Sequence, residues 1–502
     1  SGSGLPPPLV AARMSIPSAD GFRFFDPTPY LCSSSAASYM DPNLLLLPRE
    51  DWPPATSKLP VDRHELLLLG KRYDDIGAVF LFPPGEVDDD DEAIPFPTYK
   101  DELRDRHLLD RRRRNRKEKP LKCGSQFMPN GCMLADLDVA DDEVLLFSVN
   151  DLSDMYWAFL ATETRARCTP VGPAFPAEAF TGWSAYSRLK EKQKQVSSTL
   201  RMGFGGLSQG DAAGVDYAQE SHRTGLKSVG CLDPSQELLY RSVMPHFTDY
   251  VEGVMLDDHL GCLRVAKRRY QLYMQCSTDT LARDLATFDA AEQWYADVGF
   301  RSNLKKRKTR SVVVSAWGSE NEGVFHLVGP IRAKLAGFCW LASVVGRWRV
   351  TNGLSLQRLQ GMMAFAFSFN RPLYCLLFWL YRIAADDTTE LFRLSKWPAN
   401  ELILSSVLGI LSIVDVQKKY LPTIYSVDAS EAAGGVVSAH LGEGGENVSC
   451  ELWHRARRVR HGPVRLLNPI EASLKHIGFD LDGELEPDEV DLAAARMTRA
   501  AS

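Results

Sequence analysis

Short apolar runs that end in acidic residues are the most informative pattern in this sequence. Residues 143–150 (EVLLFSVN) are largely apolar, are bounded by acidic turn residues, and lead directly into Asp151. Residues 251–256 (VEGVML) form a second apolar run and lead into Asp257 and Asp258. Apolar runs of this length between turn residues predict buried strands. We therefore expect three carboxylates at the ends of two strands.

Longer periodic segments predict helices around these strands. Helical patterns occur at residues 99–109, 212–225 and 278–298, and the last of these ends at Gly299, as helices often do. Residues 329–382 carry apolar side chains at mixed three and four spacing, which predicts a helical subdomain. Residues 422–427 and 434–440 are two further strand candidates. Residues 1 to about 60 are rich in Pro, Ser and Ala, and residues 82–97 in Pro and Asp, so residues 1–99 are expected to form a largely irregular extension.

Size and composition fit a folded protein of several structural units. The chain has 502 residues, of which 45% are hydrophobic and 24% charged, values typical of soluble globular proteins. The net charge of −6 neither favours nor excludes nucleic acid, because local clusters matter more than totals. Acidic residues concentrate at 88–92 and 480–491, and basic residues at 111–119 and 305–310. The two basic clusters are the candidate phosphate contacts, although such runs are often solvated surfaces.

The cysteine pattern and the apolar stretches indicate an intracellular protein. The ten cysteines contain no CxxC pair and no accompanying HxxxH, so neither a zinc site nor a disulfide framework is indicated. The N-terminal residues lack the apolar core of a signal peptide. Of the two longest apolar stretches, residues 362–381 are interrupted by Asn370, Arg371 and Pro372, and residues 402–414 are too short to span a bilayer. We expect buried helices, no membrane association, and a location in the cytoplasm or nucleus.

Carboxylates at the ends of adjacent strands suit two-metal phosphoryl transfer. That reaction uses two divalent cations about 3.5 to 4 Å apart, and hard cations prefer carboxylate ligands. The sequence supplies DLSDMY at residues 151–156 and MLDD at residues 255–258. Asp428 follows another strand candidate but stands alone.

These two motifs resemble the first and third palm motifs of reverse transcriptases, D-x-x-x-x-[YF] and [YF]-x-D-D, although Met255 replaces the usual aromatic residue. Residues 207–210 (LSQG) are similar to the L-P-Q-G loop of that family, with Ser208 in place of proline. Residues 299–306 resemble the palm segment whose lysine approaches the triphosphate, and residues 316–318 (AWG) resemble the primer-gripping hairpin. The five segments occur in the family's order.

The resemblance implies an α+β fold of the right-hand polymerase type. It places fingers and palm at residues 100–320, with a mostly antiparallel sheet backed by helices, and a helical thumb or connection at residues 321–420. It implies two Mg²⁺ (or Mn²⁺) ions held by Asp151, Asp257 and Asp258 as catalytic residues. The nucleotide-binding residues it implies are Arg111, Arg114, Met155, Tyr156, Gln209, Gly210, Lys305 and Lys306, and the primer grip is Trp317 and Gly318.

The C-terminal segment, residues 421–502, resembles the opening of a ribonuclease H domain. In that family an aspartate on the first strand is a metal ligand, which corresponds to Asp428 here, and a hairpin follows it. Glu451 and Glu471 are candidates for a second carboxylate. Because the segment is short for the whole fold, we expect a partial ribonuclease H-like fragment.

The expected function is RNA-directed DNA polymerisation by a nucleotidyltransferase of a protist retroelement. Its partners are expected to be an RNA template, a DNA primer, RNA/DNA hybrid and deoxynucleoside triphosphates. One alternative is a catalytically inactive or domesticated descendant that binds RNA or RNA/DNA hybrid. A second is an interaction protein whose motifs are accidental, and this alternative predicts that Asp151 and Asp257 lie far apart.

Overall fold

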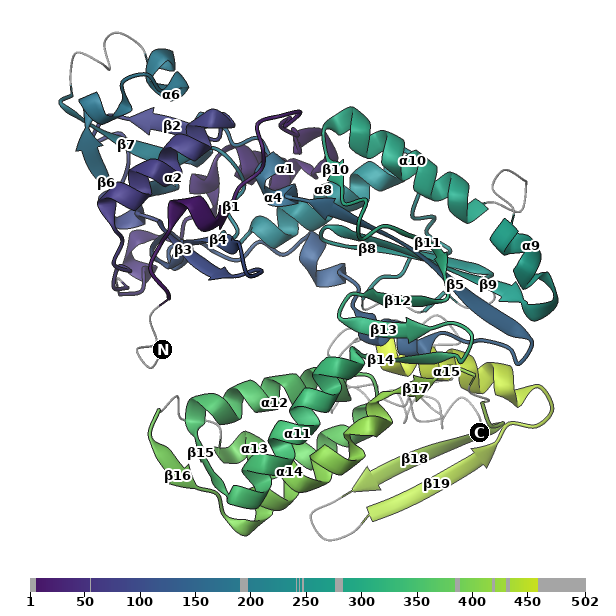
Figure 1. Cartoon of the computed structure of the whole chain (residues 1–502). Helices are drawn as coiled ribbons and strands as arrows, with labels where there is room; N and C mark the ends of the chain where they lie inside the picture. The colour runs from purple at the N-terminus through teal and green to yellow at the C-terminus, as the bar shows by residue number, and fades with distance from the viewer. Residues whose placement is uncertain are drawn as a thin grey trace, which may run out of the picture. The chain divides into compact units, whose positions relative to one another are not determined.

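The computed structural model describes residues 6–54, 56–189, 197–240, 242, 244–245, 248–275, 283–383, 389–417, 420–429 and 434–458. The chain divides into two compact units, residues 1–419 and 420–502. Both helices and sheets contribute to the first unit, and the predicted α+β fold class is confirmed (Figure 1).

The centre of the first unit is an antiparallel sheet built on the longest strand. The strand order is β10 (Arg301–Ser302), β5 (Glu143–Ser153), β9 (Asp258–Ala266) and β8 (Tyr250–Met255), and β11 (Lys308–Ser311) also pairs with β5. Strands β5 and β8 confirm the two strands predicted from the apolar runs. Both helices predicted beside them are present, as α8 (Gly214–Ser228) and α10 (Arg283–Val298), and Gly299 after α10 has a φ of +91°.

Residues of β5 alternate between the two faces of the sheet, as side chains on successive strand positions must. Leu145, Phe147 and Val149 belong to a core shared with strands β12 (Val313–Ala316) and β14 (Leu327–Pro330). Leu152, on the other face, packs with residues of α8 and α10. Asp151 has the parity of the first set, so it lies on the sheet face opposite the two helices.

Residues 6–99 are not the irregular extension that their composition suggested. They form β1 (Met14–Ser15), α1 (Ser33–Met40), α2 (Arg63–Asp75), β2 (Val79–Phe82) and β3 (Ile94–Tyr99), with several short 3-10 turns between them. Leu66, Leu69 and Tyr73 of α2 are fully buried in one core, and Phe25 and Tyr39 are buried in another. The apolar residues of this part of the chain therefore pack into two cores that they share with later segments, and Pro95 and Pro97 lie within β3.

The helix predicted at residues 99–109 is also wrong. Strand β3 pairs with β4 (Asp105–Asp110), and β1 pairs with β4 on its other side. Pro95 and Pro97 in β3 disfavour a helix leading into this segment, and β4 buries His107 and Leu109 at alternate positions, the period of a strand.

A second three-stranded sheet lies in the same N-terminal half. Its order is β2, β7 (Thr199–Phe204) and β6 (Pro170–Pro176), all antiparallel. The short helices of this half are α3 (Arg112–Asn115), α4 (Met155–Ala158), α5 (Glu163–Arg167) and α6 (Ser184–Arg188), and α9 (Tyr270–Gln275) follows β9.

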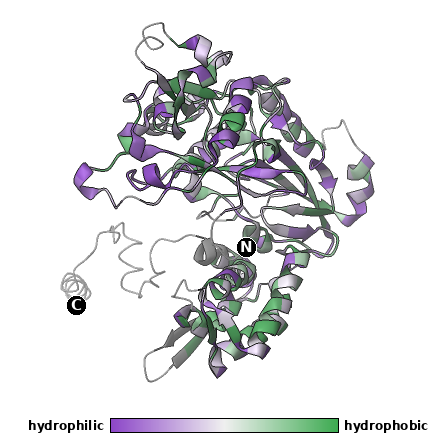
Figure 2. Ribbon diagram, turned by 60° about the vertical axis from the view of Figure 1, so that its left-hand side comes forward, coloured by the Kyte–Doolittle hydropathy of each residue, from purple (hydrophilic) through white to green (hydrophobic). Residues whose placement is uncertain are grey.

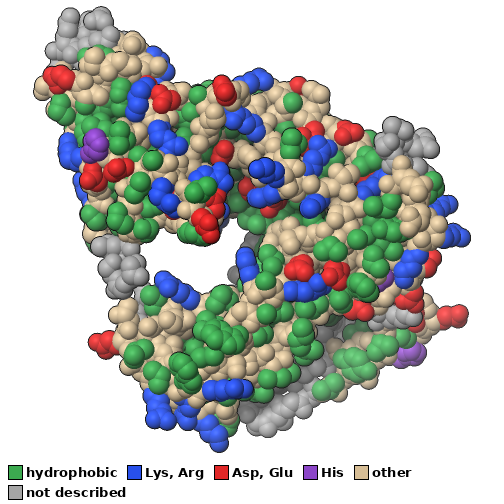
Figure 3. Space-filling model, viewed as in Figure 1, with side chains coloured by type: hydrophobic (Ala, Val, Ile, Leu, Met, Phe, Trp, Pro, Cys, Tyr) green, Lys and Arg blue, Asp and Glu red, His purple; other side chains and the backbone are tan. Residues whose placement is uncertain are grey.

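The helical subdomain predicted at residues 329–382 is present and extends to residue 408. It consists of α11 (Arg332–Trp348), α12 (Gly353–Phe367), α13 (Phe378–Ile383) and α14 (Lys396–Leu408), with a small sheet of β15 (Val350–Asn352) and β16 (Leu391–Arg393). Its core is mainly apolar, with Gln360, Glu401 and Ser405 also buried, and hydrophobic residues colour much of its helices green in Figure 2. Hydrophobic side chains gather on the surface of this subdomain in Figure 3. Trp340, Trp348 and Trp397 are among its exposed residues. None of the described helices has both the length and the apolarity needed to cross a membrane.

A four-stranded antiparallel sheet is formed by strands on both sides of the helical subdomain in sequence. Its order is β12, β13 (Ser319–Glu322), β14 and β17 (Val414–Asp415). In the second unit, β18 (Thr423–Ala429) pairs with β19 (Gly434–His440), and α15 (Gly445–Arg458) follows. Asp428 lies opposite Gly435 in this hairpin, which agrees with the two predicted strands. The side chain of Glu451 and all of Glu471 lie outside the described residues.

Candidate active site

The two carboxylate motifs meet at one end of the central sheet. Asp151 near the end of β5 is paired in register with Asp258, the first residue of β9. The backbone N–H of Leu152 donates to the carbonyl oxygen of Asp257 at 2.9 Å. This contact contradicts the alternative in which Asp151 and Asp257 are far apart.

The β8–β9 hairpin turn presents Asp257 and Asp258 to Asp151. Met255 pairs with Asp258, so Leu256 and Asp257 are the two turn residues. Leu256 has a φ of +53°, in the left-handed region that residues with a side chain rarely adopt. The turn therefore holds a strained backbone at the point where the acidic side chains emerge.

Burial and mutual repulsion perturb the carboxylates of this cluster. Burial, with the neighbouring charges of Asp257 and Asp151, raises the pKa of Asp258 to about 7. Burial and the charge of Asp151 also raise the pKa of Asp257. Asp151 is buried and Asp257 and Asp258 are half-buried, so full ionisation of all three carboxylates is disfavoured. A bound cation would relieve the repulsion between them.

In the segment after α10, Lys306 places one positive charge beside this cluster and Asn303 adds hydrogen bonds to it. The Nζ of Lys306 lies 2.6 Å from Oδ2 of Asp151, and Nδ2 of Asn303 donates to Oδ1 of Asp151 at 3.0 Å. The N–H of Asn303 also donates to the carbonyl oxygen of Asp151 at 2.7 Å. Burial opposes the charge of Lys306, but the bond to Asp151 and the negative charges of Asp151, Asp258 and Asp257 together raise its pKa. Lys305 is exposed and points to no partner among the described residues.

The donor set of this cluster suits a hard divalent cation. Three carboxylates on rigid strand ends are the ligands that Mg²⁺ and Mn²⁺ prefer. In the described part of the chain, however, no group of three His, Cys, Asp or Glu side chains is arranged closely enough to hold an ion as it stands. Both oxygens of Asp151 are instead bonded to Asn303 and Lys306. Cation binding therefore requires Lys306 to move, and its side chain, 65% exposed, has room to do so.

The predicted primer-gripping hairpin lies against the same turn. Trp317 and Gly318 connect β12 to β13 as a two-residue turn, and both have positive φ, 51° and 78°. This is the arrangement that the favoured type I′ hairpin requires. The indole Nε1 of Trp317 donates to the carbonyl oxygen of Asp258 at 3.4 Å, and the side chain is only 3% exposed. Trp317 thus supports the carboxylate turn from within the core.

The predicted nucleotide loop lies next to the residues that follow Asp151. The N–H of Leu207 donates to the carbonyl oxygen of Tyr156 at 3.2 Å. Met155 is buried in the core, whereas Tyr156 and Gln209 are half-buried. Gly210 is exposed, and a Cβ there would lie 2.0 Å from the carbonyl oxygen of Leu109, so only glycine fits this position.

Arg111 and Arg114 do not face this site, contrary to the nucleotide-binding role predicted for them. Their guanidinium groups are buried: Arg111 pairs with Glu118 and Asp211, and Arg114 with Asp91 and Glu118. Buried charges are retained only when they are paired. Arg111 contacts Asp211, which directly follows Gly210 of the loop at residues 207–210.

The first basic cluster is neutralised by the acidic run that precedes it in sequence. Arg113 and Arg116 pair with Asp90, and Lys117, which is fully buried, pairs with Asp90 and Asp91. Two features that the sequence presents as separate charged surfaces are thus one ion-pair network. This cluster offers few free cations to template phosphates.

Sequence patterns missed three residues that contact the carboxylate turn or Asp151. Asn303 bonds to Asp151, and Gln219 and His222 of α8 bond to the backbone of Val254 and Leu256. The spacing from Gly299 to Lys306 draws attention to the segment that contains Asn303. Nothing in the sequence of α8 distinguishes Gln219 and His222 from solvent-facing polar residues.

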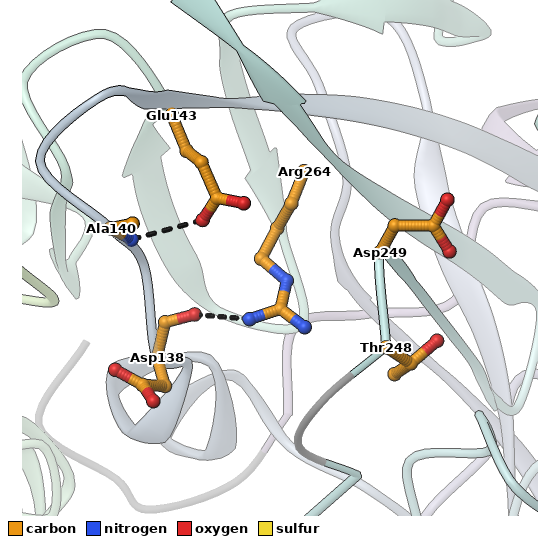
Figure 4. A pocket seen from close by; sticks show the side chains of 6 residues that line it. All are labelled: Asp138, Ala140, Glu143, Thr248, Asp249 and Arg264. Carbon is orange, nitrogen blue, oxygen red and sulfur yellow. Dashed lines mark hydrogen bonds between the residues drawn. The ribbon is translucent and has the colours of Figure 1, made fainter.

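A separate cavity of about 390 Å³ lies at the opposite end of the sheet (Figure 4). Asp138, Ala140, Glu143, Thr248, Asp249 and Arg264 line it. Nη1 of Arg264 donates to the carbonyl oxygen of Asp138 at 2.6 Å, and the N–H of Ala140 donates to Glu143 at 2.9 Å. Glu143 begins the strand that carries Asp151 near its other end, so this cavity is not part of the carboxylate site.

No protein-family model and no curated protein matches this chain. Similar solved structures include the foamy viral protease-reverse transcriptase dRH in complex with ds DNA, with 15% identity over 82% of this chain and 62% of that chain and a TM-score of 0.45. The foamy viral protease-reverse transcriptase in complex with dsDNA has 13% identity over 78% of this chain and 67% of that chain, with a TM-score of 0.46. The same protein in complex with RNA/DNA hybrid has 14% identity, covering 78% of this chain and 43% of that chain, with a TM-score of 0.46.

This chain therefore spans less than two thirds of the length of the first of these structures. TM-scores this low allow no conclusion about the function of this chain, which has to be inferred from its own residues.

Proposed function

We propose that this chain is an RNA-directed DNA polymerase that adds deoxynucleotides to a primer 3′ end. The observation that carries the proposal is the pairing of Asp151 with Asp258 and the bond from Leu152 to Asp257, which gather three carboxylates from distant segments. A cluster of like charges stabilises no fold by itself. Its presence on β5 and the β8–β9 turn supports a role in binding cations.

In this proposal Asp151, Asp257 and Asp258 hold two Mg²⁺ or Mn²⁺ ions. Such ions, when bound, would activate the primer hydroxyl and stabilise the leaving pyrophosphate. Preorganised charge and in-line positioning account for most of the rate in phosphoryl transfer. The chain's contribution is the fixed position of the three side chains on β5 and the β8–β9 turn.

Other residues would orient the reactants. Tyr156, half-buried beside the loop at residues 207–210, is placed to contact the sugar of an incoming nucleotide. Lys306, released from Asp151 by the cation, would neutralise the triphosphate. Trp317 would act on the primer indirectly, through the turn that it supports.

Primer extension tests the proposal. The full chain is mixed with oligo(dT) annealed to poly(rA), dTTP and Mg²⁺ or Mn²⁺, and the wild type is compared with Asp257→Asn. We expect extension by the wild type and none by the variant, with unchanged affinity for the hybrid in fluorescence anisotropy. Asp249→Asn, the same substitution at the far end of the β8–β9 hairpin, is the control and should extend normally. Equal extension by Asp257→Asn and the wild type would contradict the proposal.

The second candidate is a protein that binds RNA or RNA/DNA hybrid without polymerising. It is favoured by the bond of Lys306 to Asp151, which occupies an oxygen that a cation would need. Tight hybrid binding by a wild type that extends no primer with either metal would select this function. The ribonuclease H-like role of Asp428 stays a prediction.

A further inference from the structure

We propose that His222 and Gln219 of α8 are positioning residues that fix the β8–β9 turn, so that Asp257 and Asp258 face Asp151. This inference rests on the proposed polymerase function and adds two residues to it. Neither side chain reaches the carboxylate site itself; both act through the backbone of the turn.

Gln219 bonds to the turn on both sides of Met255. Its Nε2 donates to the carbonyl oxygen of Val254 at 2.8 Å, and its Oε1 accepts from the N–H of Leu256 at 2.7 Å. The side chain is 1% exposed, so no water competes for these bonds. Both polar atoms of the amide are thus used on the strand that leads into Asp257.

His222 bonds to the same turn one helical turn further along α8. Its Nδ1 contacts the carbonyl oxygen of Leu256, and its Nε2 lies 2.9 Å from the hydroxyl of Tyr295 in α10. A carbonyl oxygen can only accept, so Nδ1 carries the proton and Nε2 accepts from the tyrosine hydroxyl. Burial lowers the pKa of His222 to about 3, which agrees with one neutral tautomer. A hydrogen-bonded chain therefore runs from α10 through α8 to the turn.

The conformation of Leu256 explains why the turn needs such support. The residue has a positive φ, which a leucine adopts only when its surroundings impose it. Both its N–H and its carbonyl oxygen are bonded to α8 rather than across the hairpin. The helix, more than the hairpin, determines where the following carboxylates lie.

Buried side chains such as these could also serve only to stabilise the fold. The test therefore needs a measurement that does not change when stability alone changes. His222→Leu removes the bond to Leu256, whereas His222→Asn retains a donor near the position of Nδ1. Tyr217→Phe is the matched control, because it removes a buried hydrogen bond of α8, to Ser38 Oγ at 3.0 Å, away from the turn. Each variant is assayed for Mn²⁺ affinity by electron paramagnetic resonance, for hybrid affinity, and for kcat and KM in primer extension.

We expect His222→Leu to weaken Mn²⁺ binding and lower kcat by about tenfold, as loss of one well-placed hydrogen bond allows. KM for dTTP and hybrid affinity should stay within about twofold of the wild type. His222→Asn should recover most of the lost kcat, and Tyr217→Phe should lower only the melting temperature. If His222→Leu does not fold, Gln219→Met provides the same comparison, since it removes the other two bonds.

The experiment distinguishes a failure of the proposed polymerase function from a failure of the positioning role. A wild type that neither binds Mn²⁺ nor extends a primer would overturn the proposed function. A wild type that does both, with His222→Leu or Gln219→Met changing only the melting temperature as Tyr217→Phe does, would overturn the positioning role alone.

Discussion

Replacing Lys306 by glutamine should raise the affinity of the free protein for Mn²⁺. The ammonium group lies 2.6 Å from Oδ2 of Asp151, and its side chain is 65% exposed. An ion pair with that exposure stabilises the protein by roughly 0.2–1 kcal/mol. A cation that binds Asp151 must first break this pair, so the same energy is subtracted from its binding. Removing Lys306 should therefore increase affinity by roughly 1.4- to 5-fold.

Lys305→Gln is the control that distinguishes the effect of the Lys306–Asp151 ion pair from the effect of removing one positive charge near the site. It removes the same charge one residue away, from an exposed side chain. Mn²⁺ titrations followed by electron paramagnetic resonance, at matched ionic strength, compare both variants with the wild type. An equal affinity gain in Lys305→Gln and Lys306→Gln would refute competition at Asp151, as would a loss of affinity in Lys306→Gln.

Three further predictions concern stability and the nucleotide loop. Burial lowers the pKa of His107 to about 3. Below the ordinary histidine pKa of about 6.5, His107 binds a proton in the unfolded chain but stays neutral in the folded chain. The free energy of unfolding therefore falls as the pH falls. Urea unfolding of the wild type between pH 7 and pH 5 should lose about 2 kcal/mol more than that of His107→Gln, and equal losses would contradict this. Arg111→Met removes one of the two guanidinium partners of buried Glu118 and of buried Asp211, which keep only Arg114 and Arg165, and it should cost about 3 kcal/mol in the same assay. Arg112→Met, at an exposed pair, should cost under about 1 kcal/mol; similar costs would contradict the burial argument. Gly210→Ala, whose Cβ would lie 2.0 Å from a carbonyl oxygen, should raise KM for dTTP in primer extension without changing hybrid affinity; an unchanged KM would show that the loop is not at the nucleotide.

The strands that carry the carboxylates were predictable because each is coded locally. An apolar run ending in aspartate predicted each strand, although β5 continues past Asp151 to Ser153 and β8 ends at Met255, two residues before Asp257. The turn at Trp317 and Gly318 was expected from the family resemblance, and its two residues both have the positive φ of a type I′ hairpin.

The errors arose where long-range partners decide the structure. Arg111 and Arg114 look like surface cations until Asp211 and Asp91 are brought to them by the fold. Composition also concealed the N-terminal core, because many prolines and serines surround the few apolar residues that pack there. Single polar residues in a helix, such as His222, carry no local mark of burial.

The most direct test of the central claim is the number of Mn²⁺ ions bound at the carboxylate cluster. The full chain is combined with a dideoxy-terminated primer on poly(rA) and with dTTP, so that the complex forms without reaction. Electron paramagnetic resonance should count about two Mn²⁺ more per wild-type chain than per chain of the Asp151→Asn, Asp257→Asn double variant. Equal numbers of bound ions in the two proteins would contradict a metal site built from these aspartates.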